Sequence, residues 1–184
     1  MKFKNISKIS NITTVLLLCI TLTCQAENKI LNLKITHNDA SISVTPQIDF
    51  ITSNEIKEAI DNGIRIQLIA KAEIYQPVDW WFDKIIDNQH IQLEFSYSIL
   101  GKYYVVKNKA TEQRIGNINY NKLWDSFGSL IRFEFPKPLN NSKVKLRIVL
   151  DKGALPTAMQ LPVLFNDNWD IDTQWYHQQV TISE

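Results

Sequence analysis

Apolar and polar side chains alternate along much of the chain, and this period of two predicts β-strands. The clearest example is 64–75, in which every second residue is apolar while most of the residues between them are polar. The stretches 31–35 and 41–44 alternate in the same way, and the turn-forming residues Asn38 and Asp39 lie between them. We therefore expect these two stretches to pair as a hairpin.

The same alternation predicts further strands that are joined by short polar turns. One polar turn is expected at 87–90, in the sequence DNQH. The expected strands are 80–86 and 91–99 as the arms of a hairpin around that turn, 102–107 paired with 111–116, and then 131–135 and 144–150. After a connection that contains Pro and Gly, at 151–162, the chain is expected to end in one or two edge strands.

Two segments follow a helical period instead. In 52–63 the apolar residues fall on one face, Thr52 and Glu55 have the spacing of a capping box, and Gly63 ends the helix. A second helix is predicted at 119–128, where a glycine again stands at the end. About eight short, evenly spaced strands with two short helices favour a mostly β protein, a single antiparallel β-sandwich that is immunoglobulin-like in the broad sense.

The first 26 residues differ in composition from the rest. Lys2, Lys4 and Lys8 make the start positively charged, the apolar stretch 11–24 follows, and small residues lead up to Ala26. This arrangement predicts a secretory signal peptide that is cleaved after Ala26, which would deliver the protein to the periplasm. An uncleaved anchor is the alternative, but the apolar run is shorter than the roughly 20 residues that cross a bilayer. We expect no transmembrane span after cleavage.

Cleavage changes the chemistry of the remaining domain, 27–184. Three of the 20 Lys and Arg residues and none of the 19 Asp and Glu residues are removed, so 17 positive charges face 19 negative ones, formally −2. A domain without a basic surplus is not expected to bind nucleic acid. Cys19 and Cys24 are removed as well, and neither lies in the context of a lipid-attachment site. No disulfide or cysteine metal site is therefore expected.

No motif for catalysis or for a cofactor stands out. His37, His90 and His177 lack the close spacing of metal ligands, and no glycine-flanked serine or phosphate-binding glycine loop occurs. The acidic stretch 166–172 has part of the spacing of a calcium loop, but Ile171 stands where the loop needs a glycine. We expect a polar turn there, no metal, no cofactor and no catalytic residue.

Tryptophans are the remaining signal, and two of them are adjacent. In PVDWWFD, at 77–83, Trp80 and Trp81 would point to opposite faces of an extended strand. This geometry favours one ring in the core and the other covered by a different part of the chain. The alternative is an exposed aromatic patch for a partner, a glycan or a membrane surface. The other tryptophans are Trp124, Trp169 and Trp175.

Four segments, taken in order, carry a resemblance to a known family. They are WWFD at 80–83, LEFSYSILGKYYVV at 93–106, LDKGALPTAMQLPVL at 150–164 and NWDIDTQW at 168–175. Together they resemble domain of unknown function 4390 (DUF4390), a family of exported Gram-negative bacterial proteins without an assigned activity. The chain departs from the family at Phe82, where another Trp is frequent, and at Thr157, where Lys-Pro is frequent. The resemblance implies an envelope protein, and the gene neighbourhood of the family suggests an accessory role in two-component signalling.

These observations favour a non-enzymatic interaction module of the periplasm. The expected contact residues are Tyr75, Trp80 and Trp81 in one patch, with Trp169 and Trp175 as a possible second patch. The partner would be an envelope protein, such as the periplasmic segment of a membrane sensor, reached in part through an exposed edge strand.

Two other classes of function stay open at this point. A small ligand or glycan could stack on the tryptophans in a groove toward which Asp79 and Asp83 converge. A hydrolase would instead need two carboxylates about 5–9.5 Å apart. The candidates for such a pair are Asp83, Asp151 and Asp170.

Overall fold

The computed structural model describes residues 28–137 and 141–181 of the 184-residue chain. The described residues form nine strands in two antiparallel sheets, together with three short α-helices and three 3-10 turns. The expectation of a mostly β protein is thus confirmed. The predicted signal peptide at 1–26 lies outside the described residues.

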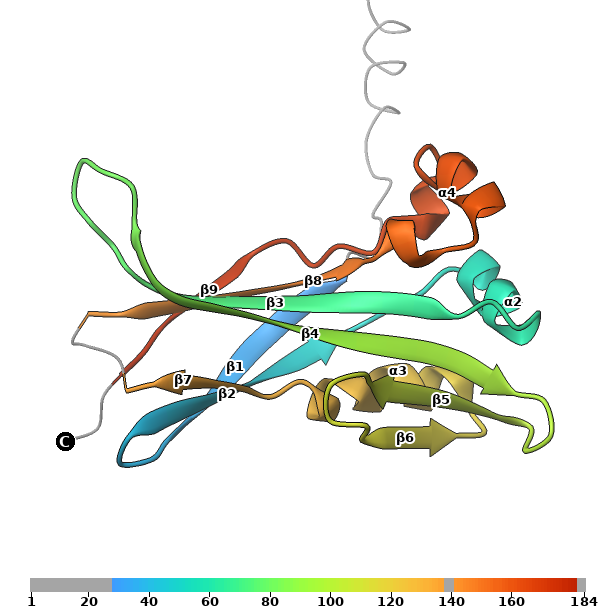
Figure 1. Cartoon of the computed structure of the whole chain (residues 1–184), viewed down its shortest axis with the longest axis horizontal. Helices are drawn as coiled ribbons and strands as arrows, with labels where there is room; N and C mark the ends of the chain where they lie inside the picture. Colours follow the sequence, from blue (N-terminus) through green and yellow to red (C-terminus); the bar gives the residue numbers. More distant parts are fainter. Residues whose placement is uncertain (1–27, 138–140, 182–184) are drawn as a thin grey trace, which may run out of the picture.

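The two sheets differ in size and shape. The smaller one has the order β1-β2-β7, and the larger one has the order β6-β5-β4-β3-β8-β9 (Figure 1). A single sandwich is not confirmed, because the strands form two sheets with one curled half-barrel. The strands are β1 (Lys29–His37), β2 (Ser41–Asp49), β3 (Ile66–Gln76), β4 (Lys84–Ser98), β5 (Tyr103–Asn108), β6 (Arg114–Asn117), β7 (Phe133–Pro136), β8 (Lys143–Leu150) and β9 (Tyr176–Gln179).

One core cluster lies between the sheets. The alternating apolar residues of β3 all face it and are buried, because a strand sends every second side chain to the same side. Trp124 stacks on Phe95 of β4, with ring centroids 4.2 Å apart, and on Phe50, which follows β2, at 5.4 Å. These stacked rings join the two sheets through the helix that carries Trp124.

Two of the expected hairpins and two of the expected strands are confirmed. β1 and β2 pair from Lys29↔Asp49 to His37↔Ile42, so the turn falls at the predicted residues. β5 and β6 form the second expected hairpin. The strands predicted at 131–135 and 144–150 correspond to β7 and β8.

The predicted turn at 87–90 is wrong. These residues lie inside β4, where His90 pairs with Lys71 and Asn88 pairs with Glu73 of β3. The polar sequence resembles a turn because this part of β4 is largely exposed and needs no apolar alternation. The hairpin therefore joins β3 to β4, and residues 77–83 form its loop rather than the start of a strand.

The two predicted helices are shorter than expected, and the structure contains a third α-helix that was not predicted. α2 (Asn54–Asp61) begins with Ser53 as N-cap, whose Oγ accepts a hydrogen bond from the backbone N–H of Ile56 at 3.3 Å, in place of the predicted Thr52. Gly63 follows α2 with a φ of 85°, as a helix-ending glycine should. The remaining elements are α3 (Tyr120–Ser126), η1 (Phe127–Leu130), η2 (Lys152–Ala154), α4 (Thr157–Val163) and η3 (Asp167–Trp169).

Candidate functional site

The loop between β3 and β4 presents three consecutive exposed aromatic rings. Trp80, Trp81 and Phe82 expose 102%, 78% and 85% of their reference areas. The loop projects beyond the body of the protein at the end of the longest hairpin, far from α2 and α4 (Figure 1). We call residues 77–83 the aromatic tip. The expectation that one of the two tryptophans enters the core is wrong, because both lie in a loop and not in a strand.

The backbone of the aromatic tip is strained at one residue. Trp80 has a φ of 65°, in the left-handed region that is unfavourable for residues with a Cβ by roughly 1–2 kcal/mol. The turn is closed weakly, by a 3.5 Å hydrogen bond from the backbone N–H of Trp81 to the carbonyl oxygen of Val78. The same left-handed conformation occurs at other residues outside the helices and strands, such as Lys102 and Gln174, so it does not by itself mark a functional site.

The surroundings of the aromatic tip are apolar with a few charges. Val78 within the loop and Ile85 and Ile86 on the adjoining part of β4 are exposed as well, so the apolar surface continues down the hairpin. Asp79 and Asp83 are exposed on either side of the three rings. Asp79 and Asp83 line no part of the depression between β2 and α3 that is described below.

Tyr75 does not belong to the exposed patch in which it was predicted, because its side chain is buried. Its hydroxyl lies 2.9 Å from Nδ1 of His177 on β9. Burial raises the pKa of Tyr75, and the nearby charge of Asp83 adds to the effect.

Lys145 of β8 lies between Tyr75 and Trp175. Its Nζ is 5.6 Å from the ring centroid of Tyr75 and 4.8 Å from that of Trp175, within the range of a cation–π contact. The same Nζ is 2.8 Å from Oε2 of Glu73. Tyr75 and Trp175, expected in separate patches, thus come together around a lysine of the protein itself.

Trp169 is also buried, so it adds no exposed surface to the predicted second patch. Its Nε1 donates to Oε2 of Glu55 at 3.1 Å, and Asn166 and Asn168 donate to the same carboxylate at 2.8 and 2.7 Å. These bonds, that of Asn168 above all, hold the pKa of Glu55 below its ordinary value. The amides of the calcium-like stretch 166–172 are therefore donors to α2, which agrees with a polar turn.

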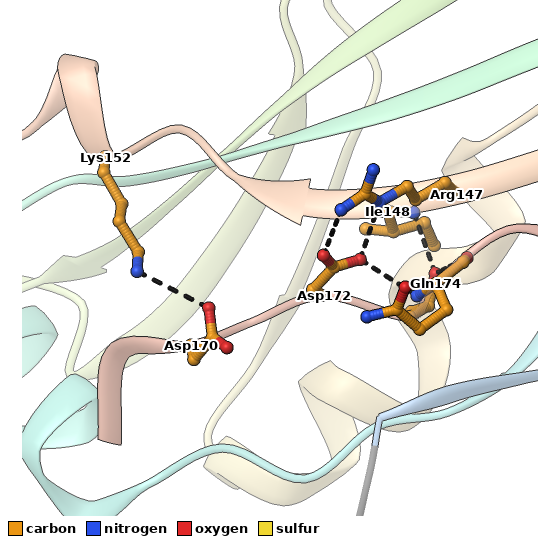
Figure 2. Close-up of polar contacts among 7 residues, drawn as sticks. Arg147, Ile148, Lys152, Asp170, Asp172 and Gln174 are labelled. Carbon is orange, nitrogen blue, oxygen red and sulfur yellow. Dashed lines mark hydrogen bonds and ion pairs between the residues drawn. The ribbon is translucent and has the colours of Figure 1, made fainter. Parts of the chain in front are cut away.

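Sequence reasoning placed Glu55 in a capping box and missed this contact, because its partners lie more than 110 residues away. It also missed the ion pair in which both Nε and a terminal nitrogen of Arg147 donate to the carboxylate of Asp172 (Figure 2). The outward position of Arg147 in the alternating strand β8 was a signal for exposure, but not for a partner.

The candidate carboxylates do not form a catalytic pair with Asp83. The backbone N–H of Asp151 donates to the carbonyl oxygen of Gln67, whereas Asp83 follows the other end of β3, where Gln76 pairs with Lys84. Nine residues of strand separate these ends by about 30 Å. Asp170, for its part, is exposed and lies 3.5 Å from Nζ of Lys152 (Figure 2).

A depression of about 260 Å³ lies between the end of β2 and α3. It contains none of the residues predicted for a site, and it is smaller than the roughly 300–1,000 Å³ of most ligand pockets. Its lining residues are Asp49, Phe50, Ile51, Thr52, Asn121, Trp124 and Asp125.

The described residues, 28–137 and 141–181, contain no group of three His, Cys, Asp or Glu side chains placed to hold a metal ion. None of their helices combines the length and the apolar character needed to cross a bilayer.

The fold and the exposed loop define a mostly β protein with two antiparallel sheets and a projecting aromatic hairpin. The chain belongs to the family described as Domain of unknown function (DUF4390), which matches residues 25–179. The expected family is therefore confirmed. The chain matches no curated protein and no solved structure.

Proposed function

We propose that the protein is a non-enzymatic interaction module of the Gram-negative periplasm, and that the aromatic tip is its contact surface. The observation that carries this proposal is the complete exposure of Trp80 together with the exposure of the two rings that follow it. Large aromatic side chains are the commonest anchors of binding surfaces. None of the three rings belongs to the core cluster that holds the sheets together.

The cellular setting of this proposal is supported by the resemblance to exported envelope proteins and by the signal-like segment at 1–26. An accessory role in two-component signalling rests on the resemblance alone. The separation of Asp83 from Asp151 argues against a hydrolase built on that pair.

Photocrosslinking in the native host tests the contact surface. A benzophenone amino acid replaces Trp81 in one variant and Leu100 in another; Leu100 is 100% exposed in the turn between β4 and β5, at the opposite end of β4. We expect adducts, whether to protein or to lipid, from position 81 and few or none from position 100. Equal yields from the two positions would show that the aromatic tip is no more than exposed surface.

A further inference from the structure

We propose that the aromatic tip inserts into the interfacial region of a phospholipid bilayer, so that the domain docks on a membrane surface through one hairpin. This inference rests on the proposed function, because it names the partner of the same surface. Indole rings favour the boundary between hydrocarbon and headgroups, where the ring is apolar and its N–H stays hydrated.

The shape of the aromatic tip favours a lipid phase over a protein partner. A ring that exposes its entire reference area, as Trp80 does, makes almost no contact with its own chain. A partner that buries this ring has to surround it on all sides. Trp81 and Phe82 pack edge to face on each other, with centroids 6.1 Å apart, and stay largely exposed. A fluid interface surrounds such a projection without a preformed shape, whereas a protein would need a deep matching pocket.

The apolar area that the three rings can bury also favours a lipid partner over a protein partner. An aromatic side chain buries about 150–250 Å², so the three rings offer on the order of 450–750 Å². A stable protein–protein contact takes about 800 Å² from each partner. Membrane insertion has no such minimum, because each ring that enters the interface adds its own transfer free energy.

The charges beside the rings limit the depth of insertion and define the lipid preference. Asp79 and Asp83 lie immediately before and after the three rings, and Lys84 begins β4. Carboxylates are costly below the headgroups, so the rings should reach the interface and no deeper. Two negative charges against one positive charge give no attraction to anionic lipid, so zwitterionic phosphatidylcholine should be sufficient for binding.

The test is titration of the purified full chain, as the host produces it, with phosphatidylcholine vesicles, with and without added phosphatidylglycerol. Trp124 and Trp169 are buried, and Trp175 is half-buried with Nζ of Lys145 4.8 Å from its ring centroid. A blue shift of tryptophan fluorescence, and its quenching by lipids brominated in the upper acyl chain, therefore report chiefly on the tip. We expect both signals with either vesicle, and at least about tenfold weaker binding for Trp80→Ser/Trp81→Ser.

Two further variants make the result decisive. Ile99→Ser/Leu100→Ser removes exposed apolar side chains at the other end of β4 and should bind vesicles as the wild type does. Asp79→Asn/Asp83→Asn removes the charges that oppose insertion and should bind more tightly. Every variant keeps the same N-terminus, so differences between them report on the substituted residues.

The outcomes separate this inference from the proposed function. Wild-type binding that is unchanged in the Trp80→Ser/Trp81→Ser variant, or absent altogether, would overturn membrane docking. If position 81 still forms protein adducts in the host, and the Asp79→Asn/Asp83→Asn variant reduces them, the partner is a protein with a basic-rimmed pocket. If position 81 forms no adducts either, the proposed function fails with the inference.

Discussion

Trp80 carries two unfavourable features at one residue, a fully exposed ring and a φ of 65°. Glycine adopts this backbone conformation without the steric cost of a Cβ, although it loses more entropy on folding. We expect Trp80→Gly to leave the free energy of unfolding unchanged or to raise it by up to about 1 kcal/mol. Urea denaturation measures this, and a loss of several kcal/mol would mean that the ring packs against the fold after all.

Asp172 carries the strongest ion pair of the C-terminal segment, because two nitrogens of Arg147 donate to its carboxylate and the backbone N–H of Gln174 donates at 2.9 Å. Its carboxylate is largely shielded from solvent, with 19% of the side chain exposed. We expect Asp172→Asn to lower the free energy of unfolding at neutral pH by about 1–2 kcal/mol. Asp170→Asn is the matched control, since that residue is exposed and only 3.5 Å from Lys152.

The same ion pair predicts a pH dependence. The hydrogen bonds from Arg147 hold the pKa of Asp172 below its ordinary value of 3.8. A lowered native pKa stabilises the fold fully above the unfolded pKa, and this contribution is lost as the pH falls from about 4 through the native pKa. Unfolding followed between neutral pH and about pH 2 should therefore show a shallower acid loss in Asp172→Asn than in the wild type. Parallel curves would contradict this assignment.

At the scale of elements, the two sheets are linked at their edges by a side chain. Gln178 of β9 donates from Nε2 to the carbonyl oxygen of Leu33 at 2.8 Å and accepts from its backbone N–H at 3.0 Å. The bond lies close to the irregularity in register of β1 between Ile30 and Asn32, where regular pairing is interrupted. The amide thus replaces a backbone ladder between β1 and β9.

We expect Gln178→Ala to lower the free energy of unfolding by about 1–2 kcal/mol, because both backbone groups of Leu33 lose their partner. Hydrogen exchange of the Leu33 amide should become faster than that of its neighbours. Gln179→Ala removes only a 3.3 Å bond to Asn141 and is the control. If the two variants have the same stability and exchange, Gln178 does not join the sheets.

At the scale of the whole molecule, Trp124 is the residue on which the two sheets meet. It is 2% exposed and stacks on Phe95 of the larger sheet and on Phe50 at the end of β2. Trp124→Ala should cost about 3–5 kcal/mol, and Trp124→Phe considerably less, because it retains a stacked ring. Calorimetry of the two variants measures the difference. A mild effect of Trp124→Ala would place the centre of the core elsewhere.

The alternation of apolar and polar residues was sufficient to predict strands that have one uniformly buried face. The strand at 64–75 was predicted because one face is uniformly buried, and β3 has that face against the core. The turn at 87–90 was predicted wrongly because the outer half of β4 is largely exposed and its strand conformation is imposed by pairing with β3. An exposed polar strand shows no alternation of apolar and polar residues, so its sequence does not reveal a strand conformation that comes from pairing with its neighbour.

The sequence by itself determined the family, the mostly β class, the positions of most strands and the presence of two adjacent tryptophans that needed an explanation. Only the tertiary structure decided which aromatics are available for contact. Trp169 and Tyr75 are buried by partners distant in sequence, while Trp80 and Trp81 lie on a loop that nothing else in the described structure covers. Whether a side chain is buried depends on which residues pack against it in three dimensions. For a residue in a loop, neither the periodicity of the sequence nor its composition reveals those contacts.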